Sequence, residues 1–394
     1  METQAIYRDI AKRCGGDVYI GVVGPVRTGK STFIKRFMET LVIPNITSEF
    51  ARERATDELP QSAAGRTIMT TEPKFIPEEA VKISLDDSAT LNVRMIDCVG
   101  YIVPSSLGYI ENEQPRMVVT PWFDKEIPFN LAAEIGTQKV INEHSTIGLV
   151  VTTDGSISDI PREEYEEAEQ RVVNELRQIN KPFVVLLNCT NPSAPAAVSL
   201  RASLEERYGV PVVAVNCLDL GEADIRVILS DVLFQFPVRE VAVSLPGWVT
   251  SLAPDHWLRT SLYDSIRQSA QDVERIGQLK SKITTLSECE YVSRVLVDNI
   301  DLGSGGASVS VDVKNDLFYR ILGEATGLEI PDESALMPCM VELAAVKREY
   351  DKVKCALDEV AATGYGIVMP SLEELSLEEP EIVKQGGRYG VRLK

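Results

Sequence analysis

Short apolar runs alternate with amphipathic segments along the first 237 residues. The runs are continuous and rich in β-branched residues, which is typical of strands buried on both faces of a sheet. Such strands are expected at residues 18–23, 80–85, 91–97, 146–153, 183–188 and 210–215. Helices are expected before and between them, at residues 3–13, 29–40, 129–144, 161–178, 198–207 and 222–234. This alternation predicts an α/β domain with a mostly parallel sheet and helices on both faces.

The pattern changes after Pro237. The elements expected there are a strand at 240–245, a helix at 256–276, strands on both sides of Gly303–Gly306, a helix near 315–324 and a final strand at 388–394. A longer helix carries apolar residues every three or four positions from Leu336 to Val360. We interpret this stripe as a face that packs within the chain, with a coiled-coil seam as the alternative.

The chain is therefore expected to have three parts. These are an α/β domain at 1–237, a middle α+β domain at 238–314, and a helical region at 315–394 that includes the start of a C-terminal region. Because the chain stops at Lys394 without a polar tail, we expect that C-terminal region to be truncated.

The composition is that of a soluble globular protein, with 44% hydrophobic and 25% charged residues. The N-terminus lacks the apolar segment of a secretory signal, and no apolar run is long enough to cross a membrane. Seven cysteines without CxxC spacing indicate a reducing compartment, and two histidines without a ligand cluster argue against a structural metal. The net charge of −19 disfavours nucleic acid as a partner. We expect a cytoplasmic protein without a direct transmembrane segment.

Residues 24–31, GPVRTGKS, match the phosphate-binding pattern G-x-x-x-x-G-K-[ST]. The match lies after an apolar strand and before a helix, as that pattern requires, which disfavours a mere glycine-containing turn with a surface lysine. The glycines let successive N–H groups point at phosphate oxygens, Lys30 reaches the β- and γ-phosphates, and Ser31 offers its hydroxyl to Mg²⁺. The residues expected to bind nucleotide here are Gly24, Arg27, Thr28, Gly29, Lys30, Ser31 and Thr32.

A carboxylate that holds Mg²⁺ is expected at the end of another strand. Asp97 ends the strand at 91–97, and Gly100 follows three residues later, as in the D-x-x-G of GTPase-like folds. There the aspartate contacts Mg²⁺ and the glycine N–H meets the γ-phosphate. Only Asp86–Thr90 separate this strand from the preceding one, so the two are expected to form an antiparallel hairpin. This hairpin, with Cys98 where the rival ATPase class has Glu, predicts a P-loop NTPase domain of the translation-factor-like GTPase class.

Folds of this class use a threonine ahead of the hairpin to complete the Mg²⁺ shell. The polar stretch there offers Thr67, Thr70 and Thr71. We favour Thr70 or Thr71, because Pro73 indicates that the chain is already extended at that point, although the β-propensity of threonine is an alternative explanation. The predicted Mg²⁺ ligands are Ser31, Thr70, Thr71 and Asp97.

The base-recognition motif of GTPases is incomplete. N-K-x-D is expected after the strand at 183–188, but the chain reads Asn188-Cys189-Thr190-Asn191. The aspartate of that motif accepts two hydrogen bonds from guanine, whereas the NH₂ group of an Asn is itself a donor and would face the donors of the guanine edge. Because such a mismatch discriminates strongly, we predict ATP rather than GTP, with Asn188 retained as a nucleotide contact.

Two further residues bear on hydrolysis, and one helix bears on partners. Tyr101 stands where many GTPases have a water-orienting Gln, so hydrolysis is expected to be slow or differently assisted. Arg27 is a candidate to supply positive charge to the phosphates in cis, as an arginine finger would, with an exposed or merely screening Arg as the alternative.

The acidic helix at 163–178 is interpreted as a solvated face rather than a partner surface.

Together these motifs resemble the stage IV sporulation protein A family, the spore-coat morphogenetic ATPases of endospore-forming bacteria. The resemblance runs through the whole chain, is densest before Pro237, and rests on GPVRTGKSTFIKRFME, DELPQSAAGRTIMTTEPKF, IDCVGYIVP, PRMVVTPWF, AAEIGTQKVINEHSTIG, TGYGI and RYGVRLK. It implies a GTPase-derived fold that binds and hydrolyses ATP with Mg²⁺. It also implies that Lys30 is the Walker A lysine, Asp97 the Walker B aspartate, and Thr70 and Thr71 the sensor threonines.

The resemblance further implies what the activity serves. Hydrolysis in the family drives irreversible self-assembly into a static polymer, the basement layer of the coat, on the mother-cell side of the forespore surface. The implied partners are further copies of the chain, other coat proteins, and a small amphipathic membrane-bound sporulation peptide. That peptide binds a C-terminal region expected to be absent or incomplete here. The alternatives are a regulatory GTPase-like switch that cycles with a protein partner, and a scaffold that binds nucleotide without turnover.

Overall fold

The computed structural model describes residues 3–60, 73–85, 89–106, 108–111, 114–271, 273–368 and 379–392. The chain divides into two compact units, residues 1–312 and 313–394. The candidate sensor threonines Thr67, Thr70 and Thr71 lie outside the described residues. The division into three parts at residues 237 and 314 stays a prediction.

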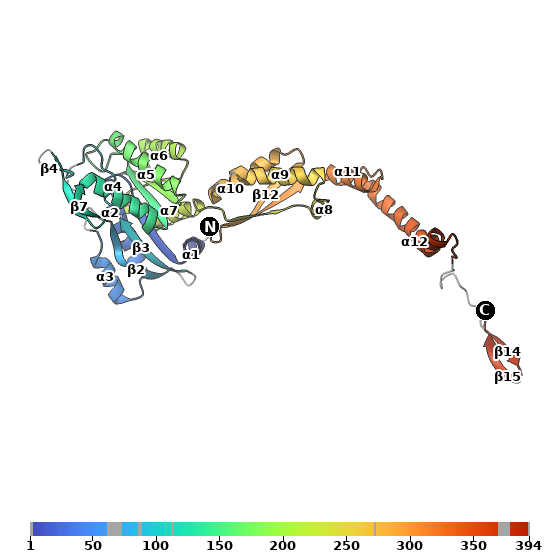
Figure 1. The fold of residues 1–394 in the computed structure, drawn as a ribbon. Coiled ribbons are helices and arrows are strands. Elements are labelled where there is room, and N and C mark those ends of the chain that lie inside the picture. The colour runs from blue at the N-terminus through green and yellow to red at the C-terminus, as the bar shows by residue number, and fades with distance from the viewer. Residues whose placement is uncertain are drawn as a thin grey trace. The chain divides into compact units, whose positions relative to one another are not determined.

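A six-stranded sheet forms the centre of the first unit, in the order β10-β9-β8-β1-β3-β2 (Figure 1). Its strands are β1 (Asp17–Val23), β2 (Lys74–Leu85), β3 (Ala89–Asp97), β8 (Ile147–Thr153), β9 (Phe183–Asn188) and β10 (Val212–Val215). Neighbouring strands are parallel except β2 and β3, which pair antiparallel with Lys74 opposite Asp97. The predicted hairpin and the α/β P-loop fold are confirmed, although β2 begins earlier than expected.

Helices cover both faces of this sheet, as predicted (Figure 1). They are α1 (Thr3–Arg13), α2 (Lys30–Phe37), α3 (Glu49–Asp57), α4 (Phe129–Lys139), α5 (Glu166–Gln178), α6 (Pro195–Tyr208) and α7 (Glu222–Phe234). Two hydrophobic clusters hold them, one including Ile10 of α1 and the other Val172 of α5. Side chains of β8 alternate between the clusters, with Leu149 and Val151 in the first and Val150 in the second.

Short elements extend the helices and follow β3. The helices α2 and α4 continue into π-helical turns at Met38–Val42 and Val140–His144, and a 3₁₀ turn at Arg162–Tyr165 leads into α5. Two small ribbons stand between β3 and α4. They consist of β4 (Ile110–Glu111), β5 (Gln114–Pro115), β6 (Met117–Thr120) and β7 (Phe123–Pro128).

A smaller α+β part completes the first unit, around a three-stranded sheet in the order β11-β13-β12. Its main elements are β11 (Glu240–Ser244), α8 (Gly247–Thr250), α9 (Trp257–Gln271), α10 (Ile276–Ile283), β12 (Val292–Asp301) and β13 (Gly306–Val313). Arg13 at the end of α1 donates to the carbonyl of Pro237 at 2.6 Å. A Cβ at Gly305 would lie 2.0 Å from Nη1 of Arg13, so α1 also reaches the turn between β12 and β13.

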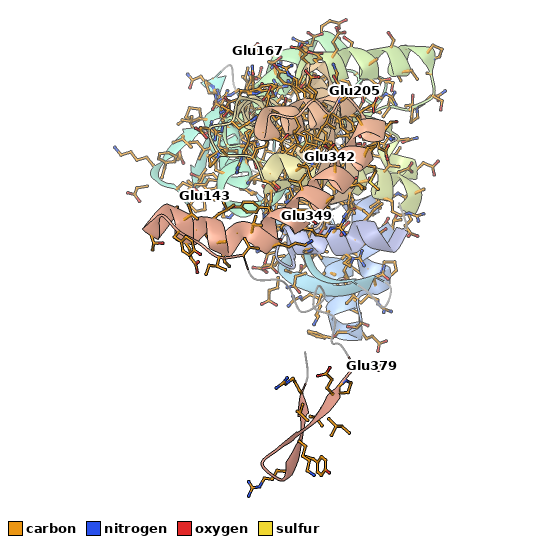
Figure 2. All side chains as sticks on the ribbon, turned by 90° about the vertical axis from the view of Figure 1, so that its right-hand side faces the viewer. Glu143, Glu167, Glu205, Glu342, Glu349 and Glu379 are labelled. Atoms are coloured by element: carbon orange, nitrogen blue, oxygen red, sulfur yellow. The ribbon has the colours of Figure 1, made fainter. Side chains whose placement is uncertain are left out.

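The second unit contains α11 (Asn315–Thr326), α12 (Glu333–Thr363) and the antiparallel pair β14 (Glu381–Gln385) and β15 (Arg388–Arg392). Side chains stand along α12, where Glu342 and Glu349 are labelled in Figure 2. Met340, Val346 and Leu357 of its apolar stripe are 53%, 59% and 49% exposed. The prediction that this stripe packs within the chain is therefore wrong for these residues. None of the helices in the described ranges combines the length and apolarity needed to cross a bilayer.

Candidate functional site

The phosphate-binding motif forms the loop between β1 and α2. Arg27 has a φ of 59° and Gly29 a φ of 92°, so the chain turns through left-handed backbone conformations that aim N–H groups at one point. A side chain at Gly29 would also meet Nδ2 of Asn188 at 2.3 Å. Arg27 adopts this conformation without being glycine, which is uncommon and marks a strained, functional loop.

Lys30 begins α2 and turns back onto this loop. Its side chain is 5% exposed, and Nζ donates to the carbonyl of Pro25 at 2.6 Å and to that of Gly24 at 3.4 Å. Burial lowers the pKa of Lys30, while the neighbouring Cys98 and Asp97 side chains act in the opposite direction. A buried ammonium held by neutral carbonyls is a strong attractor for an anion such as a phosphate.

Ser31 and Asp97 stand side by side, which fits a Mg²⁺ site. The Ser31 hydroxyl donates to Oδ2 of Asp97 at 2.6 Å, and Oδ1 of Asp97 is buried with no hydrogen-bond partner in the described structure. Burial raises the pKa of Asp97, and the bond from Ser31 and the charges of Lys30 and Lys74 oppose that rise. Mg²⁺ takes one or two carboxylates with phosphate oxygens rather than an all-protein cage. No group of three or more His, Cys, Asp or Glu side chains converges among the described residues.

The D-x-x-G loop after Asp97 lies directly on the phosphate-binding loop. The N–H of Tyr101 donates to the carbonyl of Gly24 at 3.2 Å, and the N–H of Val26 donates to the carbonyl of Tyr101 at 2.9 Å. Gly100 has a φ of 90°, and a Cβ there would lie 2.6 Å from Nζ of Lys30. The structure therefore brings Gly24, Lys30, Ser31, Asp97 and Gly100 together.

The remaining predicted residues of this loop lie in the same place. Thr28 is buried and its hydroxyl donates to the carbonyl of Pro25 at 3.0 Å. Ser31 and Thr32 are half-buried in the first turn of α2. Arg27 is half-buried, and its charge lies close enough to Tyr165 to oppose the rise in the pKa of that phenol caused mainly by burial.

Asn188 reaches this loop from the end of β9 with both ends of its amide in use. Its Nδ2 donates to the carbonyl of Thr28 at 3.0 Å, and its Oδ1 accepts from the N–H of Cys217 at 3.0 Å. These bonds brace the phosphate loop against the segment after β10, and the predicted contact of Asn188 with nucleotide stays a prediction. Cys189 beside it is fully buried.

Sequence reasoning missed one feature of the site and one of the helix α5 in the same domain. Lys74 is opposite Asp97 in the β2–β3 pair, where its charge opposes the rise in the pKa of Asp97 that burial causes; only the hairpin register would have revealed it. The acidic helix α5 and its leading turn are not simply a solvated face, since Glu169 is fully buried and is paired with Arg162 at 2.7 Å. The interpretation is wrong for Glu169, whose carboxylate also accepts from the hydroxyl of Tyr208, 39 residues away in sequence.

Two family models and several relatives match this chain. Residues 1–237 match the model described as "Stage IV sporulation protein A, ATPase domain", and residues 238–394 match the "middle domain" of the same protein. The stage IV sporulation protein A of Bacillus anthracis is 50% identical over 394 residues, which is 100% of this chain and 80% of that protein. The Clostridioides difficile (strain 630) protein is 50% identical over 99% of this chain and 79% of its own length. The Bacillus subtilis (strain 168) protein is 49% identical over 100% of this chain and 80% of its own length.

Proposed function

The chain belongs to the stage IV sporulation protein A family, a sporulation family with an ATPase domain, and on that premise we propose that its phosphate-binding loop binds and slowly hydrolyses ATP with Mg²⁺. One observation carries the proposal. Among the described residues, the buried Lys30 ammonium donates hydrogen bonds only to backbone carbonyls, and one oxygen of the neighbouring Asp97 has no hydrogen-bond partner. A phosphate and a divalent cation would supply both missing charges.

Each residue has a distinct role in this proposal. Lys30 holds the β- and γ-phosphates, and N–H groups of the loop that includes Gly24, Arg27, Thr28, Gly29, Ser31 and Thr32 surround them. Ser31 and Asp97, with Thr70 or Thr71, hold Mg²⁺, which offsets the charge that develops on the phosphates. The N–H of Gly100 meets the γ-phosphate, and Arg27 supplies a positive charge in cis.

We assign ATP rather than GTP from the base side of the site. Asn191 stands where GTPases have the guanine-binding aspartate, and its Oδ1 accepts from the N–H of Ser193 at 3.1 Å. Cys189 stands where they have a lysine and is buried. These residues offer no charge-assisted pair to guanine, which also argues against a cycling GTPase-like switch.

We propose that hydrolysis drives self-assembly of the chain into the static basement layer of the spore coat, on the mother-cell side of the forespore surface. The family supports this proposal. The proposed partners are further copies, other coat proteins and, through a C-terminal region, a small amphipathic membrane-bound peptide. The exposed apolar stripe of α12 is consistent with a chain that buries more surface on assembly.

The test is phosphate release from ATP and from GTP, with sedimentation followed in the same samples. We expect ATP-selective turnover and ATP-dependent pelleting in the unsubstituted chain, and neither in Lys30→Ala. Preference for GTP would overturn the assignment of the base. Pelleting that is equal with a non-hydrolysable analogue would show a scaffold that uses binding without turnover.

A further inference from the structure

The loop at residues 98–106, called here the anchor loop, is packed into the domain although it follows directly on Asp97. Cys98, Tyr101, Val103 and Ser106 are 6%, 2%, 0% and 4% exposed. The thiol of Cys98 donates to the carbonyl of Val22 at 3.3 Å, within β1. A segment that moves with nucleotide state needs few buried contacts, and the anchor loop has many.

Tyr101 is the point where the anchor loop meets the phosphate-binding loop. Its backbone exchanges two hydrogen bonds with that loop, to Gly24 and from Val26. These bonds hold the preceding residue, Gly100, so closely that a Cβ there would lie 2.2 Å from the carbonyl oxygen of Gly24 and 2.6 Å from Nζ of Lys30. The position of Tyr101 therefore sets the position of the glycine N–H over the phosphate site.

The phenol of Tyr101 contacts residues of α5, and a residue of α4 contacts one of them. Its hydroxyl donates to Glu175 of α5. The same carboxylate accepts from Gln138 of α4 at 3.3 Å, and the guanidinium of Arg171 lies 4.6 Å from the centroid of the Tyr101 ring. Burial, with the nearby Glu175, raises the pKa of Tyr101, so the phenol remains a protonated donor.

A second carboxylate holds the far end of the anchor loop. Glu164, in the turn that leads into α5, accepts from the N–H of Ser105 at 2.7 Å and from its hydroxyl at 2.6 Å. The anchor loop is thus fixed to β1 at one end and to the α5 region at two points. Hydrogen bonds to charged acceptors are stronger than neutral ones, so both anchors contribute to order.

We propose that Tyr101 is a positioning residue: held by Glu175, it keeps the anchor loop in place before nucleotide binds, so that Gly100 is a preformed part of the phosphate site. The inference rests on the proposed ATPase function and adds which residue positions part of that site. The loop is a fixed wall that does not open and close with nucleotide. Electrostatic groups that are placed before the reaction need no reorganisation during it.

The experiment compares amide hydrogen exchange and ATP turnover in the full chain and in Tyr101→Phe, Glu175→Ala and the double variant. We expect the N–H groups of Val26, Tyr101 and Ser105 to exchange slowly without nucleotide in the unsubstituted chain, and little differently with ATP and Mg²⁺. Tyr101→Phe should speed exchange at Val26 and Tyr101 by about tenfold, the equivalent of one hydrogen bond. Turnover, kcat, should fall by about tenfold or more, while KM changes much less.

The double variant and a control separate positioning from general damage. Because Tyr101 and Glu175 act as one pair, the double variant should exchange no faster than the more affected single variant. Glu167→Ala, an exposed change on the same helix (Figure 2), should leave exchange and turnover unchanged. A Tyr101→Phe protein with unchanged exchange and kcat would overturn the proposal. So would slowing of anchor-loop exchange by about a hundredfold or more on ATP binding, which would show a switch.

Failure of the proposed function would look different. If the unsubstituted chain hydrolysed no ATP, the turnover comparison would refute the ATPase assignment. The exchange rates without nucleotide would still decide whether Tyr101 and Glu175 hold the anchor loop, because that hydrogen-exchange measurement requires no ATP.

Discussion

Two buried charged sites lie in the same domain, and they differ in whether side chains of the protein pair with the buried charged groups. Glu169 of α5 is fully buried, and its carboxylate accepts from Arg162 at 2.7 and 2.9 Å, from the Tyr208 hydroxyl at 2.5 Å and from the Thr152 hydroxyl. These four residues are called the Glu169 cluster. At the phosphate site, by contrast, Lys30 donates to backbone carbonyls, and one Asp97 oxygen has no hydrogen-bond partner in the part of the chain that the structure describes.

The difference separates a structural site from a binding site. Burying a charge costs free energy unless an opposite charge and hydrogen bonds compensate for the lost water. In the Glu169 cluster, side chains of the chain itself neutralise and hydrogen-bond the buried carboxylate, so no ligand is needed to offset the cost of burying it. At the phosphate site part of the cost of burying charge is not offset by the chain, and a ligand of the right charge would remove it. We therefore expect substitutions to separate loss of stability from loss of activity.

The largest effect is expected for Lys30→Ala, and on activity alone. Removing the ammonium should lower ATP turnover by about a thousandfold, because it removes the main positive charge on the phosphates. The free energy of unfolding without nucleotide should change by less than about 1 kcal/mol. The reason is that, among the described residues, Lys30 donates hydrogen bonds to backbone carbonyls and to no charged side chain. Phosphate release and urea denaturation measure the two quantities. A large loss of stability would show that Lys30 is structural.

Arg162→Ala should produce the reverse. It removes the cation from Glu169 and leaves a buried carboxylate without its charge partner, which should lower the free energy of unfolding by about 3 kcal/mol. Urea denaturation followed by circular dichroism provides the measurement. The control is Arg171→Ala, whose ion-paired side chain is 43% exposed and should cost less than about 1 kcal/mol. Equal losses in the two variants would contradict the comparison.

Asn188→Ala tests a residue that lies at the phosphate site but resembles the Glu169 cluster in having both polar ends paired. The substitution leaves the carbonyl of Thr28 and the N–H of Cys217 without their partner. We expect a loss of about 2 kcal/mol in the free energy of unfolding. Nucleotide affinity should fall less than in Lys30→Ala, as equilibrium binding of a fluorescent ATP analogue would show. Full stability with lost binding would instead make Asn188 a nucleotide contact.

The smallest effect is expected for Asp301→Asn, which changes a carboxylate outside both sites whose side chain is 44% exposed. Hydrogen bonds from Ser304 and a lesser contribution from Lys12 lower the pKa of Asp301 to about 2. Because the folded pKa lies below the unfolded value, Asp301 stabilises the fold above the unfolded pKa, and this contribution is lost as pH falls through the folded pKa. The variant should be less stable by under about 1 kcal/mol at pH 7 and equal to the unsubstituted chain near pH 2. Denaturation at a series of pH values would contradict this if the difference grew on acidification.

Local patterns were sufficient to predict most of the fold. Continuous apolar runs placed the strands of the central sheet, and the short link before β3 gave its antiparallel partner β2. The apolar stripe from Leu336 to Val360 shows the limit of that approach. Its period gave the helix α12, but a period does not say what covers the face, and Val346 is 59% exposed.

The sequence by itself determined the phosphate site, because eight consecutive residues carry its backbone turns, its lysine and its serine, and Asp97 ends an adjacent strand. It also determined the departure from the N-K-x-D motif at Cys189 and Asn191. Only the tertiary structure decided which charged groups are paired. Tyr101 meets Glu175 across 74 residues of sequence, and Asn188 meets Thr28 across 160. Such pairs depend on how helices and loops pack over the sheet, and no local pattern contains that information.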